Sequence, residues 1–334
     1  MSPGATLMKS EGYVIGIDGG GTKTLGLIAD THGKVLASAA GGTSNPQVIG
    51  FDKASQVVLK VIKECCRRAK CHPGHVLAVV VGLAGAGRES DRQRAEIGIR
   101  KLARKKNVPL RSFRVESDAR IALEGALGGE PGLVLISGTG SIGFAKDDRG
   151  TIHRVGGWGR AIGDEGSGFA VGRQAVIAIA RYLDGRGEPT ILTRLAAKAF
   201  GLSDPQSIIS KIYQNHFDVS CIAPLVLKAA GEGDKVSKKI LVEASLELAD
   251  HVRVLLKKLR PSAKSPHGKK TRLVFLGGML ERPNYFSRSL TKRINSLFPS
   301  VQIQSARKSP AYGAVLLALK RPNHSTRNHS GRRA

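Results

Sequence analysis

The sequence is poor in cysteine and aromatic residues and has no long apolar run. Four cysteines in 334 residues are too few for a disulfide scaffold. No apolar run approaches the ~20 residues of a membrane-spanning helix, and residues 1–12 lack the apolar core of a signal peptide. We therefore expect a cytoplasmic protein without membrane insertion.

Negative charge is also scarce. Lys and Arg number 53 against 26 Asp and Glu, which gives a formal net charge of +27. Such a charge attracts anions of many kinds. Aromatic residues make up only 4%, and no aromatic-interleaved RNA motif or helix–turn–helix pattern is present. We interpret the charge mainly as a solvated surface and expect no specific nucleic-acid binding.

The chain repeats one local pattern more than a hundred residues apart. The first copy has apolar strands at 13–17 and 25–29 around a glycine turn, followed by a turn and a strand at 35–37. The second copy has strands at 133–136, 142–145 and 151–153 around a second small-residue turn. This pattern indicates an internal duplication, and the length favours two domains.

The other segments alternate between strand and helix patterns. Apolar spacing predicts further helices and strands, together with a surface loop and a polar basic tail. We expect helices at 52–70, 91–105, 119–126 and 311–319, a mostly helical stretch at 169–258, strands at 76–83, 113–115 and 273–276, a loop at Pro261–Lys270, and a disordered tail at 321–334.

The first glycine turn, Asp18-Gly19-Gly20-Gly21-Thr22-Lys23-Thr24, is neither a P-loop nor a dinucleotide fingerprint, because a strand follows it instead of a helix. Its glycines let backbone N–H groups surround phosphate oxygens, and Thr22 and Lys23 add a hydroxyl and a positive charge. Asp18 is placed to hold Mg²⁺ through water. The alternative is a plain tight hairpin.

Two other glycine segments follow predicted strands. Gly138-Thr139-Gly140-Ser141 offers a second set of backbone and hydroxyl donors, so the pair of turns favours a nucleotide held between two lobes. Gly277-Gly278 is a candidate for close approach to an adenine ring, or a simple connection from strand to helix.

These motifs, taken in order, resemble the N-acetylglucosamine kinase and BadF/BadG/BcrA/BcrD-type ATPase family, within the superfamily of actin-like sugar kinases and heat-shock ATPases. The resemblance rests on both glycine turns and on five other blocks: Thr43-Ser44-Asn45, Glu116-Ser117-Asp118-Ala119, Gly156-Gly157-Trp158-Gly159 leading to Gly163-Asp164-Glu165-Gly166-Ser167, Leu276-Gly277-Gly278, and Ser309-Pro310-Ala311-Tyr312-Gly313-Ala314. No motif matches between about Arg181 and Lys270.

The resemblance implies an α/β fold of two ribonuclease-H-like lobes with ATP and Mg²⁺ in the cleft. We expect an N-terminal lobe at 10–119 with a closing helix at 310–320, and a C-terminal lobe at 120–309 with a helical insertion. It also implies a homodimer and an amino-sugar substrate. The nucleotide contacts expected from the motifs are Asp18, Gly20, Gly21, Thr22, Lys23, Gly138, Thr139, Gly140, Gly277 and Gly278.

By the same resemblance, Asp118 is the catalytic base that accepts the proton of the sugar hydroxyl. Its alternative is a helix N-cap. The implied sugar contacts are Asn45, Asp118, Ser141, Gly157, Trp158, Gly159 and Asp164. Trp158 is the only tryptophan, and its alternative is a buried packing residue. Asn45 has the alternative of capping a turn.

The expected activity is ATP-dependent phosphorylation of N-acetylglucosamine or glucosamine at the 6-hydroxyl. N-acetylmuramic acid is an alternative substrate, since its carboxylate suits a basic protein. Two rival functions remain: an ATPase that couples hydrolysis to a partner, and a non-catalytic nucleotide-sensing or nucleic-acid-binding protein. Cys65, Cys66 and Cys71 show no Cys-x-x-Cys spacing, so we expect no metal cluster.

Overall fold

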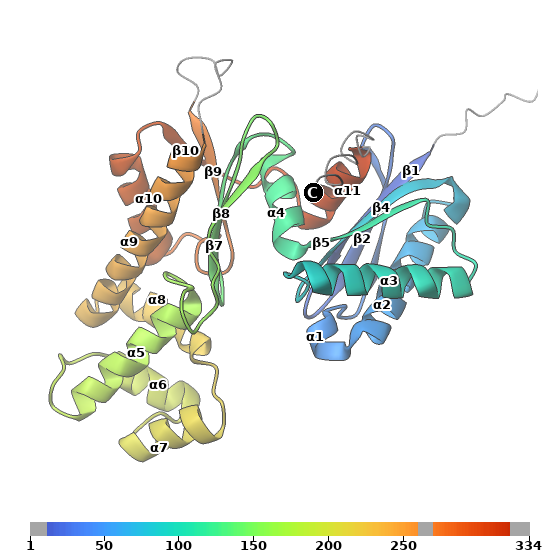
Figure 1. Cartoon of the computed structure of the whole chain (residues 1–334). Coiled ribbons are helices and arrows are strands. Elements are labelled where there is room, and N and C mark those ends of the chain that lie inside the picture. Colours follow the sequence, from blue (N-terminus) through green and yellow to red (C-terminus); the bar gives the residue numbers. More distant parts are fainter. Residues whose placement is uncertain (1–11, 260–269, 321–334) are drawn as a thin grey trace, which may run out of the picture. The chain divides into compact units, whose positions relative to one another are not determined.

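The computed structural model describes residues 12–259 and 270–320. Within them the chain forms two compact units (Figure 1): residues 12–129 with 307–320, and residues 130–259 with 270–306. The tail expected at 321–334 lies outside the described residues, and so does the loop expected at Pro261–Lys270 except for its last residue, Lys270. None of the helices in the described ranges is long and apolar enough to span a membrane.

Each unit contains a five-stranded sheet, and the two sheets share one topology. The first has the order β3-β2-β1-β4-β5 and the second β8-β7-β6-β9-β10. In both, the first three strands along the chain pair with one another antiparallel, and the last two extend the sheet in parallel from the other side of the first strand. The strands are β1 (Tyr13–Gly19), β2 (Thr24–Asp30), β3 (Val35–Gly41), β4 (Val76–Leu83), β5 (Ser112–Ser117), β6 (Gly132–Ser137), β7 (Ser141–Lys146), β8 (Ile152–Gly156), β9 (Thr271–Leu276) and β10 (Val301–Gln304).

The repeated strand order agrees with the duplication that the two glycine turns indicated, and the expected α/β fold of two lobes is confirmed. Both turns join the first and second strands of their sheets, β1 to β2 and β6 to β7. A β-hairpin that opens a five-stranded sheet is therefore built twice by one chain.

Helices cover both faces of the first sheet. Side chains alternate between the faces of a strand, so Ile15 and Ile17 of β1 join one apolar cluster while Val14 joins another. The first cluster includes α2 (Phe51–Arg68) and α3 (Glu89–Lys105), and α1 (Pro46–Ile49) precedes α2. The second includes α4 (Asp118–Leu127) and α11 (Pro310–Leu319).

Glycines allow α4 and α11 to cross at very short range. A Cβ on Gly313 would lie 2.0 Å from the backbone oxygen of Ile121, and a Cβ on Gly125 would lie 2.3 Å from that of Ser309. The N–H of Arg307 also donates to the carbonyl of Ala126 at 3.0 Å. The segment from 307 to 319 thus completes the first unit, although the second unit separates it from residue 129 along the chain.

The second unit carries the helical insertion between β8 and β9. The stretch that the sequence predicted as mostly helical contains α5 (Gly168–Leu183), α6 (Leu192–Phe200), α7 (Pro205–Ile209), α8 (Ala223–Gly231) and α9 (Lys235–Lys258), with short turns at Ser210–Gln214 and Val219–Ile222. Together with α10 (Tyr285–Leu297), these helices bury one apolar core against the sheet. Helix α10 and strand β10 (Val301–Gln304) were not predicted from the sequence.

Candidate functional site

The predicted residues of the first unit gather at one edge of its sheet. Strands β1, β4 and β5 are parallel, so their carboxyl ends meet at the same edge. Asp18 lies at the end of β1, and Asp118 directly follows β5. In open α/β sheets this is the edge where ligands bind.

The first glycine turn is held from both sides. The N–H of Gly20 donates to the carbonyl of Lys23 at 2.9 Å, and the carbonyl of Gly20 accepts from the N–H of Ser44 at 3.3 Å. The Thr43 hydroxyl donates to the same carbonyl at 3.2 Å. The block Thr43-Ser44-Asn45 therefore fixes the turn, a role that the motif match alone did not reveal.

The top of this turn offers unused hydrogen-bond donors. Gly21, Thr22 and Lys23 are exposed. Within residues 12–259 and 270–320, the N–H groups of Gly21 and Thr22 donate to no protein atom. A Cβ on Gly21 would meet nothing within 4 Å. Open backbone donors beside a lysine are suited to phosphate oxygens.

Two carboxylates act on each other beside the turn. Burial and the nearby carboxylate of Asp118 raise the pKa of Asp18, while the ammonium of Lys23 opposes the shift. Burial also raises the pKa of Asp118, although the N–H groups of Ala119 and of Asp118 itself work in the opposite direction. The Asp118 residue as a whole nevertheless remains exposed.

The alternative explanation of Asp118 as a helix cap is wrong. The N-cap of α4 is Ser117, whose hydroxyl accepts from the N–H of Arg120 at 3.2 Å. Asp118 is the first helical residue, and one oxygen of its carboxylate accepts from the N–H of Ala119 at 2.8 Å. A negative charge in the first turn also suits the helix dipole.

Asn45 caps the short helix α1, where its alternative proposed the cap of a turn. Its Oδ1 accepts from the N–H of Gln47 at 2.9 Å at the start of α1. Gly85 lies against this side chain at a φ of +79°, and a Cβ there would fall 2.2 Å from Asn45 Oδ1. The contact ties Asn45 to the segment after β4, at the same sheet edge as Asp18.

The second unit builds a corresponding turn after β6. The N–H of Gly138 donates to the carbonyl of Gly140 at 2.9 Å. The carbonyls of Gly138 and Thr139 accept from the N–H groups of Gly168 and Phe169 at 2.7 and 3.1 Å. In the described part of the chain, the N–H groups of Thr139 and Gly140 donate to no protein atom, as at Gly21 and Thr22.

Gly277 packs directly against this second turn. Its φ is +91°, and a Cβ there would lie 2.4 Å from the carbonyl oxygen of Ser137 and 3.0 Å from the nitrogen of Gly138. A side chain at this position would push the turn away, so glycine is required. Gly278 faces open space.

Asp164 is held against the second turn by Ser141. The N–H of Ser141 donates to Asp164 Oδ1 at 3.3 Å, and its hydroxyl donates to the carbonyl of Glu165 at 2.6 Å. Ser141 is buried, so its hydroxyl serves this internal bond. Asp164 itself has a positive φ of 61°, a conformation that non-glycine residues rarely adopt.

Trp158 is on the surface, which overturns the alternative of a buried packing residue. Its exposed fraction is 70%, and the guanidinium carbon of Arg154 lies 5.7 Å from its ring centroid. Gly157 and Gly159 on either side have φ values of +71° and +87°. The indole thus stands on a glycine loop and presents its ring to solvent.

Sequence reasoning missed the residue beneath this loop. His251 of α9 is buried, and its Nδ1 lies 2.8 Å from the carbonyl oxygen of Glu247, to which it donates. A Cβ on Gly156 would fall 2.3 Å from His251 Nε2. Because His251 is nearly a hundred residues away along the chain, no local pattern could have identified this contact.

A divalent cation fits the residues at the first turn. Within the described residues, no three His, Cys, Asp or Glu side chains form a metal-binding group. Mg²⁺ does not need one, since it commonly binds one or two carboxylates, several waters and substrate phosphates. The mutual repulsion of Asp18 and Asp118 is what such a cation would relieve.

Two of the cysteines are core residues. Cys65 and Cys66 are buried in the core between α2 and the first sheet, and burial raises the pKa of each thiol to about 12. Protonated, inaccessible thiols are poor ligands and poor nucleophiles.

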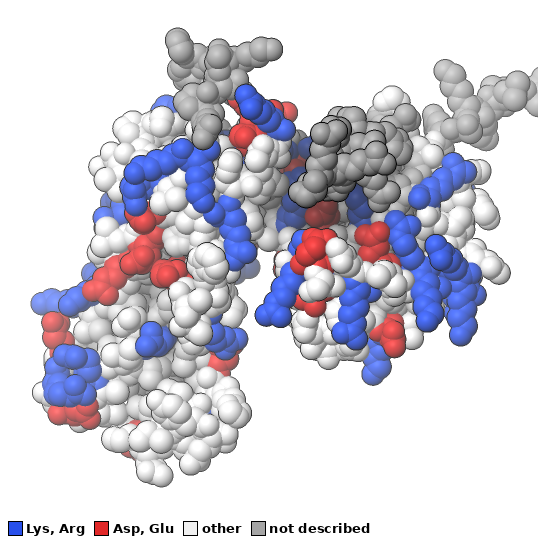
Figure 2. Space-filling model, in the orientation of Figure 1, with Lys and Arg blue, Asp and Glu red and all other residues white. Residues whose placement is uncertain are grey.

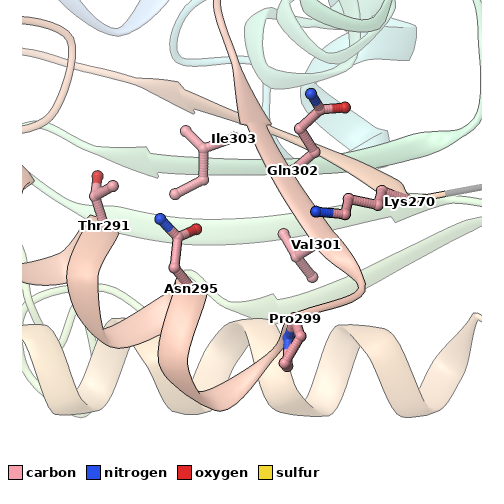
Figure 3. Close-up of a pocket in the computed structure, with 7 residues that line it drawn as sticks. All are labelled: Lys270, Thr291, Asn295, Pro299, Val301, Gln302 and Ile303. Carbon is pink, nitrogen blue, oxygen red and sulfur yellow. The ribbon is translucent and has the colours of Figure 1, made fainter.

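A cavity of about 470 Å³ lies elsewhere in the second unit, between β10 and α10 (Figure 3). Its lining side chains include Thr291 and Asn295 of α10 and Gln302 of β10. It contains none of the predicted site residues and no carboxylate.

Comparison with known proteins places these features in a family. The model of the BadF/BadG/BcrA/BcrD ATPase family matches residues 15–318. An N-acetylmuramic acid/N-acetylglucosamine kinase of Clostridium acetobutylicum is 35% identical over 92% of this chain and 98% of its own length. An N-acetyl-D-glucosamine kinase of Dictyostelium discoideum is 31% identical over 93% of this chain and 98% of its own length.

Solved structures share the fold. A Chromobacterium violaceum protein assigned as an N-acetylglucosamine kinase is 27% identical and superimposes with a TM-score of 0.68, covering 93% of this chain and all of its own. A glucokinase of the ROK family from Streptomyces griseus, solved with glucose and an ATP analogue, has a TM-score of 0.52 at 17% identity, with coverage of 92% and 99%. The second likeness concerns the fold alone.

Proposed function

Because the chain belongs to the BadF/BadG/BcrA/BcrD ATPase family, we propose that it is an ATP-dependent kinase of amino sugars. The substrates we propose are N-acetylglucosamine and glucosamine, phosphorylated at the 6-hydroxyl. The activities named for the two relatives support a sugar kinase. The activity of the Clostridium relative makes N-acetylmuramic acid the second candidate substrate.

One observation carries the proposal: an exposed residue, Asp118, interacts electrostatically with Asp18 beside a turn with free N–H donors. Phosphoryl transfer depends chiefly on positioning and on neutralising charge, and the attacking hydroxyl needs an acceptor for its proton. In this proposal Asp118 accepts that proton. Asp18 holds Mg²⁺ through water, and the cation neutralises charge on the phosphates when bound.

Each glycine turn contributes free donors to ATP binding in this proposal. Gly21 and Thr22 supply them from the first turn, with Lys23 adding charge, and Thr139 and Gly140 supply them from the second. Gly277 and Gly278 allow the adenine to approach the backbone closely. Asn45, Trp158 and Asp164 are the proposed sugar contacts.

The test is a substrate panel in which ADP formation is measured with ATP and each hexosamine. A kinase forms ADP only when a sugar is added, and NMR of the product identifies the phosphorylated hydroxyl. Equal ADP formation without any sugar would contradict the proposal and favour an ATPase that drives a partner. The proposed homodimer is checked by sedimentation of the same preparation.

A further inference from the structure

The proposed reaction leaves one dense stretch of positive charge on the first unit unused. Residues 97–115 contain seven Lys or Arg and no Asp or Glu. Five of these residues are exposed and form what we call the basic cluster: Lys101, Arg104, Lys105, Lys106 and Arg111. Figure 2 shows Lys and Arg side chains gathered over the right-hand end of α3, as α3 is oriented in Figure 1.

Helix geometry aligns the cluster. Lys101, Arg104 and Lys105 are spaced i, i+3 and i+4, so their side chains share one face of α3. Lys106 follows the last helical residue, and Arg111 lies in the connection to β5. The opposite face of α3 is fixed in the core through Ala95, Ile99 and Ala103, so the exposed face cannot rotate inward.

The cluster has no acidic partners. Elsewhere on α3, Arg92 pairs with Glu89, and Arg100 pairs with Glu96 at 3.0 Å. Across residues 12–259 and 270–320, no member of the basic cluster forms an ion pair. The five charges of the cluster therefore face solvent and mobile counterions.

Stabilisation of the helix end explains only part of this charge. Cations near a helix C-terminus interact favourably with the dipole, but the effect is confined to the last turn. It accounts for Arg104 and Lys105, which end α3. It does not account for Arg111 beyond the helix or for the complete lack of acidic residues over nineteen positions from 97 to 115.

The cluster lies away from the proposed catalytic residues. Helix α3 follows the carboxyl end of β4 and runs back along the sheet, so its last turn is near the amino end of β5. There the Arg100 guanidinium donates to the carbonyl of Phe113 at 2.6 Å. Asp18 and Asp118 lie at the opposite, carboxyl edge of the strands.

We propose that the basic cluster is a docking surface for the phosphate backbone of nucleic acid, bound without regard to base sequence. From Lys101 to Lys106 the helix rises about 7 Å, comparable with two base-pair steps of about 3.4 Å each. A membrane surface is a poorer fit. Helices that lie in membranes present large apolar residues to lipid, whereas Ile97 is the only exposed large apolar residue on α3.

The test compares two variants of the full chain with the same loss of charge. The first replaces Lys101, Arg104, Lys105 and Lys106 with Gln, which keeps helix propensity. The control replaces four exposed lysines of the second unit, Lys198, Lys235, Lys239 and Lys257, with Gln. Binding of a fluorescent duplex of about 24 base pairs is followed by anisotropy from about 50 to 300 mM salt.

We expect the cluster variant to lose at least about tenfold in affinity at low salt and the control less than about twofold. The slope of log K against log salt should fall by about 0.9 for each phosphate contact removed. Sugar-dependent ADP formation by the cluster variant should remain within about twofold of the wild type. Retained activity would show that the variant is folded and that the loss of duplex binding is separate from the proposed kinase function.

Three outcomes would overturn this docking surface. Equal loss in both variants would mean that net charge alone attracts the duplex. Absence of duplex binding by the wild-type protein at low salt would show that nucleic acid is not the partner of the cluster. Sedimentation with anionic phosphatidylserine vesicles, without duplex binding, would assign the cluster to membranes.

Discussion

Asp118 is the residue on which the proposed chemistry depends most directly. In Asp118→Asn the amide keeps the size of the side chain but cannot accept the hydroxyl proton. We expect the turnover number for the sugar to fall at least about a hundredfold, while ATP binding is retained. Steady-state kinetics and calorimetric titration with ATP measure the two effects. Near-normal turnover would remove Asp118 from the role of base.

Asp18 gives a prediction for stability. Its pKa in the folded protein is raised above the ordinary value of 3.8 by burial and by Asp118. The folded state thus keeps the proton to a higher pH than the unfolded state. The free energy of unfolding should therefore fall as pH rises from 3.8 through the raised pKa. Asp18→Asn should reduce this decline and be more stable than the wild type at neutral pH, as measured by urea unfolding.

Asp234 provides a control of opposite sign. Burial acts to raise its pKa, but hydrogen bonds from Ser237, Ile191 and Thr190 outweigh it, so the pKa is lowered. Asp234 also caps α9. Asp234→Asn should destabilise the protein at neutral pH, and the wild-type contribution should vanish as pH falls below 3.8. A common response of both variants to pH would contradict the assignment at Asp18.

Trp158 gives a prediction for the binding of the sugar. Because its ring is exposed on a glycine loop, its removal leaves the core intact. We expect Trp158→Ala to raise the KM for the sugar at least about tenfold and the KM for ATP much less. Kinetics with each substrate varied in turn provide the measurement. Unchanged sugar kinetics would show that the indole is not part of the sugar site.

Motif spacing predicted both glycine turns, which follow β1 and β6 in the structure, because each turn depends on residues adjacent in the chain; the role of Asp118 as base stays a prediction. It did not identify what supports them. Ser117 was missed as the cap of α4, and His251 was missed beneath Gly156. The first error concerns one position in a helix start, where Ser and Asp are both favoured caps. The second is a tertiary contact without a local signal.

Among the elements, the crossing of α4 and α11 is the most tightly packed. A Cβ on Gly313 would meet backbone atoms of Ile121 and Gly125, which cannot move like a side chain. We expect Gly313→Ala to lower the free energy of unfolding by at least about 2 kcal/mol. The matched control, Gly231→Ala at the end of α8, meets nothing within 4 Å and should be close to neutral. Chemical denaturation of both variants is the measurement, and equal stability would refute the close crossing.

Strong periodicity located most elements. The strand expected at 76–83 is β4 with the same bounds, and the helix expected at 91–105 is α3, which begins two residues earlier. Helix α10 was missed, although Phe286, Leu290 and Ile294 recur every four residues and are buried. Its Ser, Thr and Asn residues are weak helix formers, so packing against the core, which a sequence does not display, decides its conformation.

The charge of the whole molecule has a kinetic consequence. A net charge of +27 should attract ATP, which is strongly anionic, over distances that salt screens. We expect kcat/KM for ATP to fall several-fold between about 50 and 250 mM salt, while the KM for neutral N-acetylglucosamine changes little. Kinetics at matched viscosity measure both. A parallel decline for both substrates would point to a general effect of salt on the enzyme.

The two-lobed fold was predictable because a repeated hairpin with a glycine turn is legible in the sequence. The chain's division was harder to predict. Helix α4 follows β5 and packs on α11, so it belongs with the first unit, whose described residues run to 129 and resume at 307. The residue pattern of α4 or α11 alone does not indicate against which sheet the helix packs.

The placement of α11 also bears on the order of events at the ribosome. Val14, Ala29 and Val80 of the first sheet are buried in the cluster that contains Ala314 and Val315. When residue 129 emerges, that sheet lacks its last cover, and it must wait for synthesis of the entire second unit. The unit that is synthesised first is therefore completed last. Until residues 307–319 have been made, the apolar face of its sheet that α11 covers stays exposed on the nascent chain.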